Sequence, residues 1–210
     1  MCPFLVPQQG EVLNEETKYC VLTSAHWQED FIKVISIYAQ KIYTQTQSVL
    51  VFDGSLGLGD LCANNQSIDE ENVNSVLQRG KALSTLVERQ NNGIDLISGQ
   101  SKVLNMGIYS EIQLQAMCTD LELLGKNYQK VLIYAPPTLP SVQRFFCKNF
   151  DSICLTFATE TDIAEALSLS QSYPRMKCCL AGKKDLPDVT QALELGLANQ
   201  KDYFLSLNIE

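Results

Sequence analysis

The residues best suited to chemistry in this sequence lie close together, just after position 24. His26, the only histidine of the chain, is followed by Trp27, and Glu29 and Asp30 come shortly after. An imidazole beside two carboxylates could support acid–base catalysis or hold a ligand. Nothing in the sequence places a serine or cysteine nucleophile against His26, so nucleophilic catalysis is not predicted. A lone histidine in a loop commonly has no catalytic role. A catalytic site at His26 is therefore the less favoured of the two interpretations.

The cysteines predict buried thiols and no metal site. There are eight, and none forms a Cys-x-x-Cys pair. Most lie in apolar runs, as Cys154 does between Ile153 and Leu155, which is typical of small buried side chains in a reducing cytoplasm. On a strand, Cys178 and Cys179 would point to opposite faces. With a single histidine, a Cys/His zinc cluster is not expected either.

The charge of the chain disfavours two classes of partner. It has 16 basic and 24 acidic residues, for a net charge of −8, which disfavours a broad grip on nucleic acid or anionic lipid. No run approaches the roughly 20 apolar residues that span a bilayer. Residues 1–9 lack the features of a signal peptide, and residues 187–196 lack a basic face. We expect a cytoplasmic protein without its own membrane anchor.

The elements that would position these residues alternate in type along the chain. Short apolar runs predict strands, and runs with apolar residues at helical spacing predict helices. The expected strands are 19–23, 48–52, 94–99, 131–134, 152–158, 176–180 and 203–207, and the expected helices are 31–43, 73–89, 109–125, 141–149, 160–170 and 187–196. This alternation predicts an α/β fold with a mostly parallel sheet flanked by helices. Residues 19–210 are expected to form one domain after a tail or short first strand, 1–18.

Three segments follow predicted strands at the end where open α/β sheets bind ligands. They are the loop after Thr23, the glycine-rich segment 53–60, and the segment 134–140 with its two adjacent prolines. Counting Ser24 as one, Asp53 is the thirtieth residue. The sequence at 53–60 is Asp-Gly-Ser-Leu-Gly-Leu-Gly-Asp, and residues 128–137 read Tyr-Gln-Lys-Val-Leu-Ile-Tyr-Ala-Pro-Pro.

The order and spacing of these segments resemble the MinD/ParA family of ATPases with a deviant Walker A motif, which includes the flagellar-number regulator FlhG. The family pattern has a Ser-Gly-Lys-Gly-Gly-Val-Gly-Lys-Thr loop, then Asp-x-Asp-Leu-Gly-Leu-x-Asn, then a Walker B strand Tyr-Asp-x-Val-Ile-Ile-Asp-x-Pro-Pro. Residues 94–99 and 156–170 are similar to later family segments, so the resemblance runs from about 19 to 171. It implies a P-loop NTPase-like fold, here shortened at the C-terminus.

The departures from this pattern fall on the nucleotide-binding positions. A working loop needs glycines, whose amides converge on phosphate, a lysine to neutralise it, and a hydroxyl for Mg²⁺. His26 and Phe31 stand at the two lysine positions, and Ile32 replaces the Mg²⁺-binding threonine. Asp53 is kept, while Ser55 and Tyr134 replace two catalytic aspartates. The resemblance therefore implies a degenerate nucleotide site formed by Ser24, Ala25, His26, Trp27, Asp30, Phe31, Ile32, Asp53, Ser55 and Tyr134.

These departures predict a catalytically inactive pseudo-ATPase with no cofactor and no metal. By resemblance it would act as a scaffold or regulator in positioning or counting a cell structure, such as a flagellum, pilus, division site or chromosome. Its partner would be a protein, an intact paralogue or a second copy. Trp27 and Phe31 would contact that partner, or Trp27 would pack into the vacant nucleotide space; both interpretations remain open. Asp53 is expected to accept hydrogen bonds from backbone amides. The alternative is an enzyme or ligand-binding protein with a repurposed cleft that uses His26, Asp53 and Tyr134.

Overall fold

The structure is a computed structural model that describes residues 17–25, 30–55, 82–97, 109–156, 160–182 and 204–208. Residues 1–16 of the predicted tail, residues 73–81 of the predicted helix 73–89, the predicted helix 187–196 and the loop residues 26–29 lie outside the described residues.

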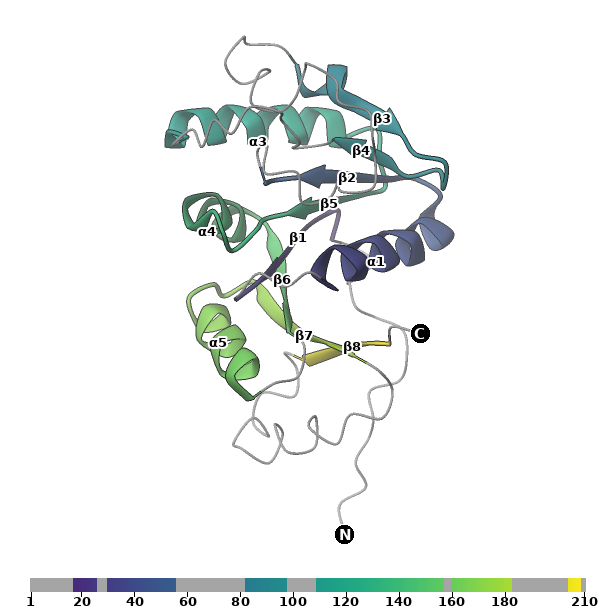
Figure 1. The fold of residues 1–210 in the computed structure, drawn as a ribbon. Helices are drawn as coiled ribbons and strands as arrows, with labels where there is room; N and C mark the ends of the chain where they lie inside the picture. The colour runs from purple at the N-terminus through teal and green to yellow at the C-terminus, as the bar shows by residue number, and fades with distance from the viewer. Residues whose placement is uncertain are drawn as a thin grey trace.

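The architecture is one sheet with helices on both faces (Figure 1). The sheet has eight strands in the order β3-β4-β2-β5-β1-β6-β7-β8, and every pairing is parallel except that of β3 with β4. The strands are β1 (Tyr19–Ser24), β2 (Val49–Asp53), β3 (Val87–Arg89), β4 (Asp95–Ile97), β5 (Lys130–Tyr134), β6 (Asp151–Thr156), β7 (Met176–Gly182) and β8 (Phe204–Asn208).

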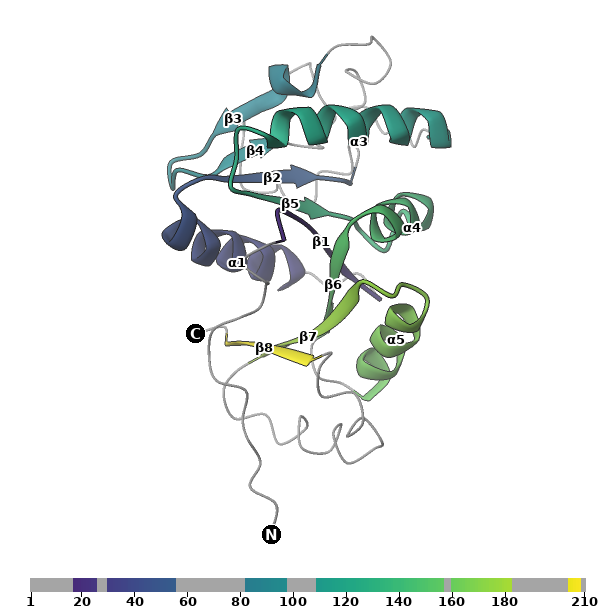
Figure 2. The same ribbon diagram turned by 180° about the vertical axis from the view of Figure 1, so that it is seen from behind.

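The described helices divide between the two faces of the sheet. Helix α1 (Asp30–Thr46) covers one face, while α3 (Glu111–Gly125), α4 (Pro140–Asn149) and α5 (Glu160–Gln171) cover the other. The view from behind shows the same division (Figure 2). Because parallel neighbours need crossover helices, a sheet of this kind is buried on both sides.

Each face of the sheet has its own apolar core. Leu132 and Tyr134 of β5 point to the α1 side, and the alternate residues Val131 and Ile133 point to the side of α3 and α4. This alternation is the period of two of a strand, and all four side chains are buried because both faces are covered. The predicted continuous apolar runs therefore correspond to strands buried from both sides.

The sequence placed most elements correctly and one wrongly. Residues 83–89, predicted as the end of a helix, form a 3-10 turn, η2 (Leu83–Leu86), and the edge strand β3. Val87 pairs with Ile97 and Arg89 with Asp95 in an antiparallel hairpin whose turn contains Gly93 at a φ of 86°. Pairing with β4 and a glycine turn outweigh the helical spacing of the leucines. Ser110 caps α3 in a capping box with Gln113.

The described cysteines agree with the prediction of buried thiols. Cys20, Cys118, Cys147, Cys154 and Cys178 are all buried and free. Burial raises the pKa of Cys118 and of Cys147 to about 12. No group of His, Cys, Asp and Glu side chains in the described part of the chain could hold a metal ion. In the same residues, no helix is both long and apolar enough to cross a membrane.

Candidate functional site

The carboxyl ends of β1, β2 and β5 meet at one edge of the sheet. Leu22 pairs with Tyr134 across β1 and β5, and Asp53 pairs with Tyr134 across β2 and β5. Ser24 lies beyond Leu22 in β1, so the structure brings Ser24, Asp53 and Tyr134 together. This is the edge at which parallel α/β sheets bind ligands.

Asp53 ends β2 and is fully buried. Its Oδ1 accepts a hydrogen bond of 2.9 Å from the backbone amide of Ser55. The predicted contact between the Asp53 carboxylate and a backbone amide is therefore present. The hydroxyl of Ser55 is also fully buried, and among the described residues it has no hydrogen-bond partner. A buried hydroxyl without a partner costs free energy.

Gly54 brings the turn after β2 against the backbone of β5. Its amide donates a 2.7 Å hydrogen bond to the carbonyl oxygen of Tyr134. A Cβ atom added to Gly54 would lie 2.2 Å from the same oxygen. The sequence suggests turn geometry as the reason for this glycine, but the structure indicates the close approach of two backbones.

Tyr134 is the largest fully buried side chain among the described residues. Its ring belongs to the core between the sheet and α1, together with Leu22, Ile35 and Tyr38. The residue that the resemblance places at the Walker B aspartate thus contributes to apolar packing. A neutral phenol in this place adds no negative charge to the strand end.

A glutamine that sequence reasoning missed joins three elements at this edge. The side-chain amide of Gln143, in α4, donates hydrogen bonds of 2.7 Å to Thr23 Oγ1 and 2.8 Å to the carbonyl oxygen of Ser24. The Thr23 hydroxyl in turn donates a 2.7 Å bond to the carbonyl oxygen of Ala135. Gln143 lies among buried positions of α4, between Val142 and Phe146. In the sequence, Gln143 could have been found as a polar residue on the otherwise apolar face of a predicted helix.

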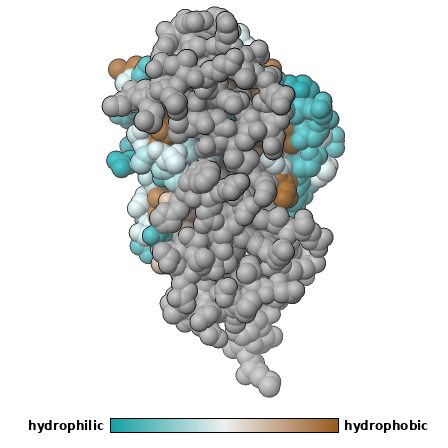
Figure 3. Space-filling view, viewed as in Figure 1, coloured by the Kyte–Doolittle hydropathy of each residue, from teal (hydrophilic) through white to brown (hydrophobic). Residues whose placement is uncertain are grey.

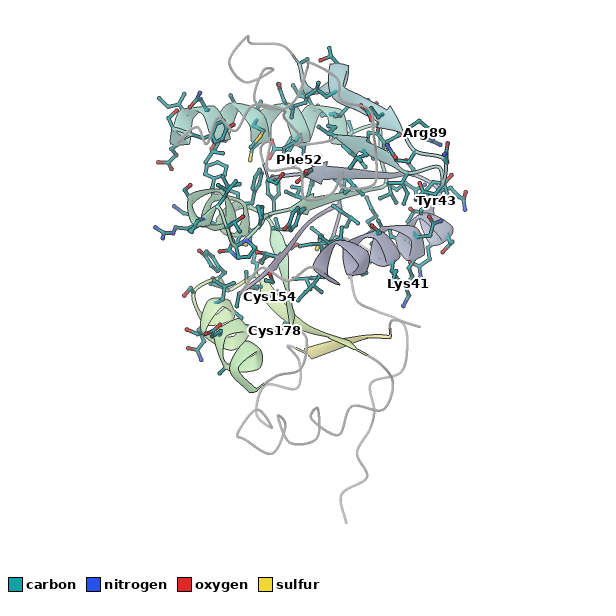
Figure 4. All side chains as sticks on the ribbon, viewed as in Figure 1. Lys41, Tyr43, Phe52, Arg89, Cys154 and Cys178 are labelled. Atoms are coloured by element: carbon teal, nitrogen blue, oxygen red, sulfur yellow. The ribbon has the colours of Figure 1, made fainter. Side chains whose placement is uncertain are left out.

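The first loop is described only at its two ends. At the first of these ends, the backbone of Ala25 lies near the thiol of Cys154 in β6 and acts to lower the pKa of that thiol, an effect that other contacts outweigh. Contact with Cys178 and burial raise the pKa of Cys154 well above its usual value, so this thiol stays protonated. Figure 4 shows Cys154 and Cys178 beside each other on β6 and β7, where they are paired in register. Helix α1 begins at Asp30, and the side chains of Asp30, Phe31 and Ile32 lie outside the described part of the chain, as do His26 and Trp27.

The three strand ends carry little charge. Of the described residues 22–25, 52–55 and 133–136, Asp53 alone has an ionisable carboxylate, and none has a basic side chain. A single buried carboxylate already bonded to an amide is a weak basis for a divalent cation site, because Mg²⁺ needs several oxygen ligands in near-octahedral geometry.

Comparison with known proteins finds similarity in structure alone. No family model matches the sequence, and no curated protein matches it. Among solved structures, a plasmid partition protein from Borrelia burgdorferi matches with a TM-score of 0.69 and 16% identity over 90% of this chain and 88% of that one. A ParA family ATPase from Chlorobium tepidum matches with a TM-score of 0.66 and 14% identity, covering 94% and 86% of the two chains. The chain has the ParA/MinD fold.

A third neighbour extends the likeness to the cell-division branch of this fold. The MinC:MinD cell division complex of Aquifex aeolicus matches with a TM-score of 0.62 and 14% identity, over 85% of this chain and 72% of that chain. The predicted P-loop NTPase-like architecture, with a mostly parallel sheet and flanking helices, is confirmed. At these identities the likeness concerns the fold, and the chemistry has to be argued from the residues.

Proposed function

We propose that this protein is a pseudo-ATPase of the ParA/MinD type that keeps the fold and acts through protein partners. The observation that carries the proposal is the set of residues at the two strand ends where such an ATPase binds phosphate and Mg²⁺. Residues 24–32 contain neither glycine nor lysine. Tyr134 lies in the apolar core at the position of the Walker B carboxylate.

The composition of the first loop disfavours binding of a triphosphate. Without glycines the backbone is restricted in bringing several amides toward one phosphate, and without lysine nothing offsets the negative charge. Glu29 adds a carboxylate to the loop, and Asp30 adds another at the first residue of α1. A helix N-terminus attracts anions, so a carboxylate there competes with phosphate for the same partial positive charge.

The second half of the site supports the same interpretation. Asp53 is retained, but its carboxylate accepts a hydrogen bond from Ser55 within its own turn. Gln143 and Thr23 link α4, β1 and β5 by neutral hydrogen bonds. These contacts between protein groups join the strand ends to one another, which supports the proposal that the fold does not require nucleotide.

Nucleotide-dependent thermal unfolding tests the proposal. A ligand present at about 100 times its Kd should stabilise the folded state by about 2.7 kcal/mol. We expect no shift of the melting temperature with Mg²⁺ and ATP, ADP or GTP, and no phosphate release above a protein-free control. An intact ParA-type ATPase run in parallel provides the positive control. A clear shift together with turnover would refute the pseudo-ATPase.

The absence of glycine and lysine from residues 24–32 also bears on how the protein would bind its partner. We propose a scaffold or regulator that helps to position or count a cell structure, since solved neighbours are a plasmid partition protein and a cell division complex. Any dimer, with a second copy or an intact paralogue, would form without a loop lysine reaching across ATP. Light scattering after gel filtration should give the same mass with and without Mg²⁺-ATP, and a nucleotide-induced dimer would contradict this.

One observation favours a second candidate, a ligand-binding protein with a repurposed cleft. The buried hydroxyl of Ser55 has no partner in the described part of the chain, and it lies beside Asp53 at the edge of the sheet where parallel α/β folds bind ligands. A small molecule with a hydrogen-bonding group could satisfy it. A thermal-shift screen of metabolites, repeated with Ser55→Ala, separates the candidates, because a true ligand of this site should stabilise the parent protein and lose that effect in the variant.

A further inference from the structure

Helix α3 exposes an apolar stripe on the side that faces away from the sheet. Ile112 and Leu123 are 82% and 55% exposed, and with Ile37 they are the exposed large hydrophobic residues of the described chain. Ala116 and Thr119 lie between them and are also exposed. These four residues follow one another at steps of four, three and four, which places them within an arc of about 60° on the helix surface. We call them the α3 stripe.

Among the described residues, α3 packs onto the protein through the face opposite this stripe. Leu114, Met117, Cys118 and Leu121 form the inward face of α3 and are buried against the core that α3 shares with α4. Figure 3 shows hydrophobic atoms at the surface in the upper left, where α3 lies. An apolar stripe opposite a complete buried face is a feature of helices that also bind a partner.

Acidic residues border the α3 stripe on both sides. By helical position, Glu111 and Glu122 lie along one margin and Asp120 lies along the other. None of the three forms an ion pair within the described part of the chain. Lys126 is the one basic residue between 109 and 129, so α3 with its flanking residues carries a net negative charge.

The side chains of the stripe differ in size in a way that suits a helix. Large residues stand at its two ends, while Ala116 and Thr119 leave its middle shallow. Such a surface admits an alkyl side chain of a facing helix between Ile112 and Leu123, as in ridge-and-groove packing.

We propose that the α3 stripe docks an amphipathic helix of a partner protein whose alkyl side chains are flanked by lysine or arginine. A second copy of this chain is the less suitable occupant, because each copy carries a net charge of −8 and the same acidic margins would meet. A basic helix brings opposite charges together along both margins. The proposal involves neither the strand ends nor nucleotide, so it stands or falls separately from the pseudo-ATPase.

Two designed peptides provide the test. Both have about four helical turns with leucines along one face; one carries lysines at the margins of that face and the other carries glutamates. Binding to the full chain is measured by fluorescence polarisation. We expect the lysine peptide to bind at least about tenfold more tightly, and its affinity to fall with added salt.

Variants of exposed residues localise the binding. Ile112→Ser with Leu123→Ser should weaken binding of the lysine peptide by about tenfold or more. Ile37→Ser, at an exposed position on α1, is the matched control and should leave binding unchanged. Glu111→Lys with Glu122→Lys should reverse the preference between the two peptides. Since all five altered positions are exposed, the variants should unfold at nearly the same temperature as the parent, which calorimetry verifies.

Three outcomes would overturn the proposal. One is equal affinity for the two peptides, and another is unchanged affinity after the double serine substitution. The third is a dimer of the chain, seen by sedimentation, that the double serine substitution dissociates, because a second copy would then occupy the α3 stripe.

Discussion

The two ends of the sheet hold their aspartates in different ways. At the amino end, Asp95 in β4 accepts hydrogen bonds of 3.0 and 3.1 Å from Arg89 and one of 2.9 Å from the hydroxyl of Tyr128. At the carboxyl end, Asp53 is fully buried and its carboxylate accepts the backbone amide of Ser55. At the amino end a carboxylate near solvent is paired with a guanidinium. At the carboxyl end, none of the described residues 22–25, 52–55 and 133–136 has a basic side chain.

The two ends differ in the kind of contact that joins their elements. Figure 4 places Arg89 and Tyr43 at the hairpin end of the sheet, where the ion pair between Arg89 and Asp95 lies near the glycine turn. At the carboxyl end, neutral hydrogen bonds of Thr23 and Gln143 join β1, α4 and the residue that follows β5. Substitutions at the two ends can therefore be compared by their effect on the free energy of unfolding. The comparison tests how much the contacts at the carboxyl end contribute to stability.

The largest effect is expected from Gly54→Ala. The new Cβ would meet the carbonyl oxygen of Tyr134 at 2.2 Å, so β2 and β5 must separate and the hydrogen bond between them must weaken. We expect a loss of about 3 kcal/mol in the free energy of unfolding, measured by chemical denaturation.

Gly93→Ala is the matched substitution at the amino end. Gly93 has a φ of 86°, and its added Cβ would lie 2.3 Å from the hydroxyl of Tyr43, the far end of a side chain that can move. We expect a smaller loss, about 1.5 kcal/mol. If Gly93→Ala costs as much as Gly54→Ala, the carboxyl end is not the more tightly packed of the two.

A second large effect is expected from Gln143→Leu. The substitution keeps the volume but removes both donated hydrogen bonds, which leaves the buried Ser24 carbonyl without this donor. We expect a loss of about 2 kcal/mol. Gln115→Leu, at an exposed position of α3, should change the stability by less than about 0.5 kcal/mol. Equal effects of the two substitutions would show that the network contributes nothing.

These residues also show how far sequence reasoning reaches. The strands were predictable because sheets buried on both faces impose unbroken apolar runs, as in residues 131–134. The helix cap at Ser110 was predictable because capping is local in sequence. The strand at 87–89 was not, since its partner β4 and the turn at Gly93 determine it.

The candidate site was predictable where it depends on strand order, but not where it depends on contacts between distant residues. The meeting of Ser24, Asp53 and Tyr134 follows from strand topology, which the order of the segments already implied. The role of Gln143 depends on α4 lying against the end of β1, a contact between residues 120 positions apart. Tyr134 is buried because α1 covers that face of the sheet, which is also a tertiary contact that the local sequence does not determine.

A smaller effect is expected at the amino end at high pH. Burial and the hydrogen bond to Asp95 raise the pKa of Tyr128 from 10.0 to about 12. The folded state holds this proton more tightly, so the resulting stability is fully present below pH 10 and is lost as the pH rises toward 12. Tyr128→Phe should cost about 1 kcal/mol at neutral pH and should flatten part of that decline.

Denaturation curves recorded across the alkaline range, with tyrosinate absorbance followed in parallel, measure this effect. Tyr109, whose pKa burial alone raises to about 12, is retained in the variant and serves as the internal reference. A decline that is as steep in Tyr128→Phe as in the parent would show that the contact between Tyr128 and Asp95 does not stabilise the hairpin end.

The smallest effect, and the one with an unusual sign, is expected from Ser55→Ala. The hydroxyl is fully buried without a partner, so its removal should leave the free energy of unfolding unchanged or raise it by up to about 1 kcal/mol. Ser110→Ala is the matched control, because that hydroxyl caps α3 and its loss should cost about 1 kcal/mol. Opposite signs for two serine-to-alanine changes would show that the carboxyl end retains a polar atom that the folded chain does not use. A clear loss of stability in Ser55→Ala would instead mean that the hydroxyl is satisfied in solution, by water or a bound molecule, and would favour the ligand-binding alternative at this end of the sheet.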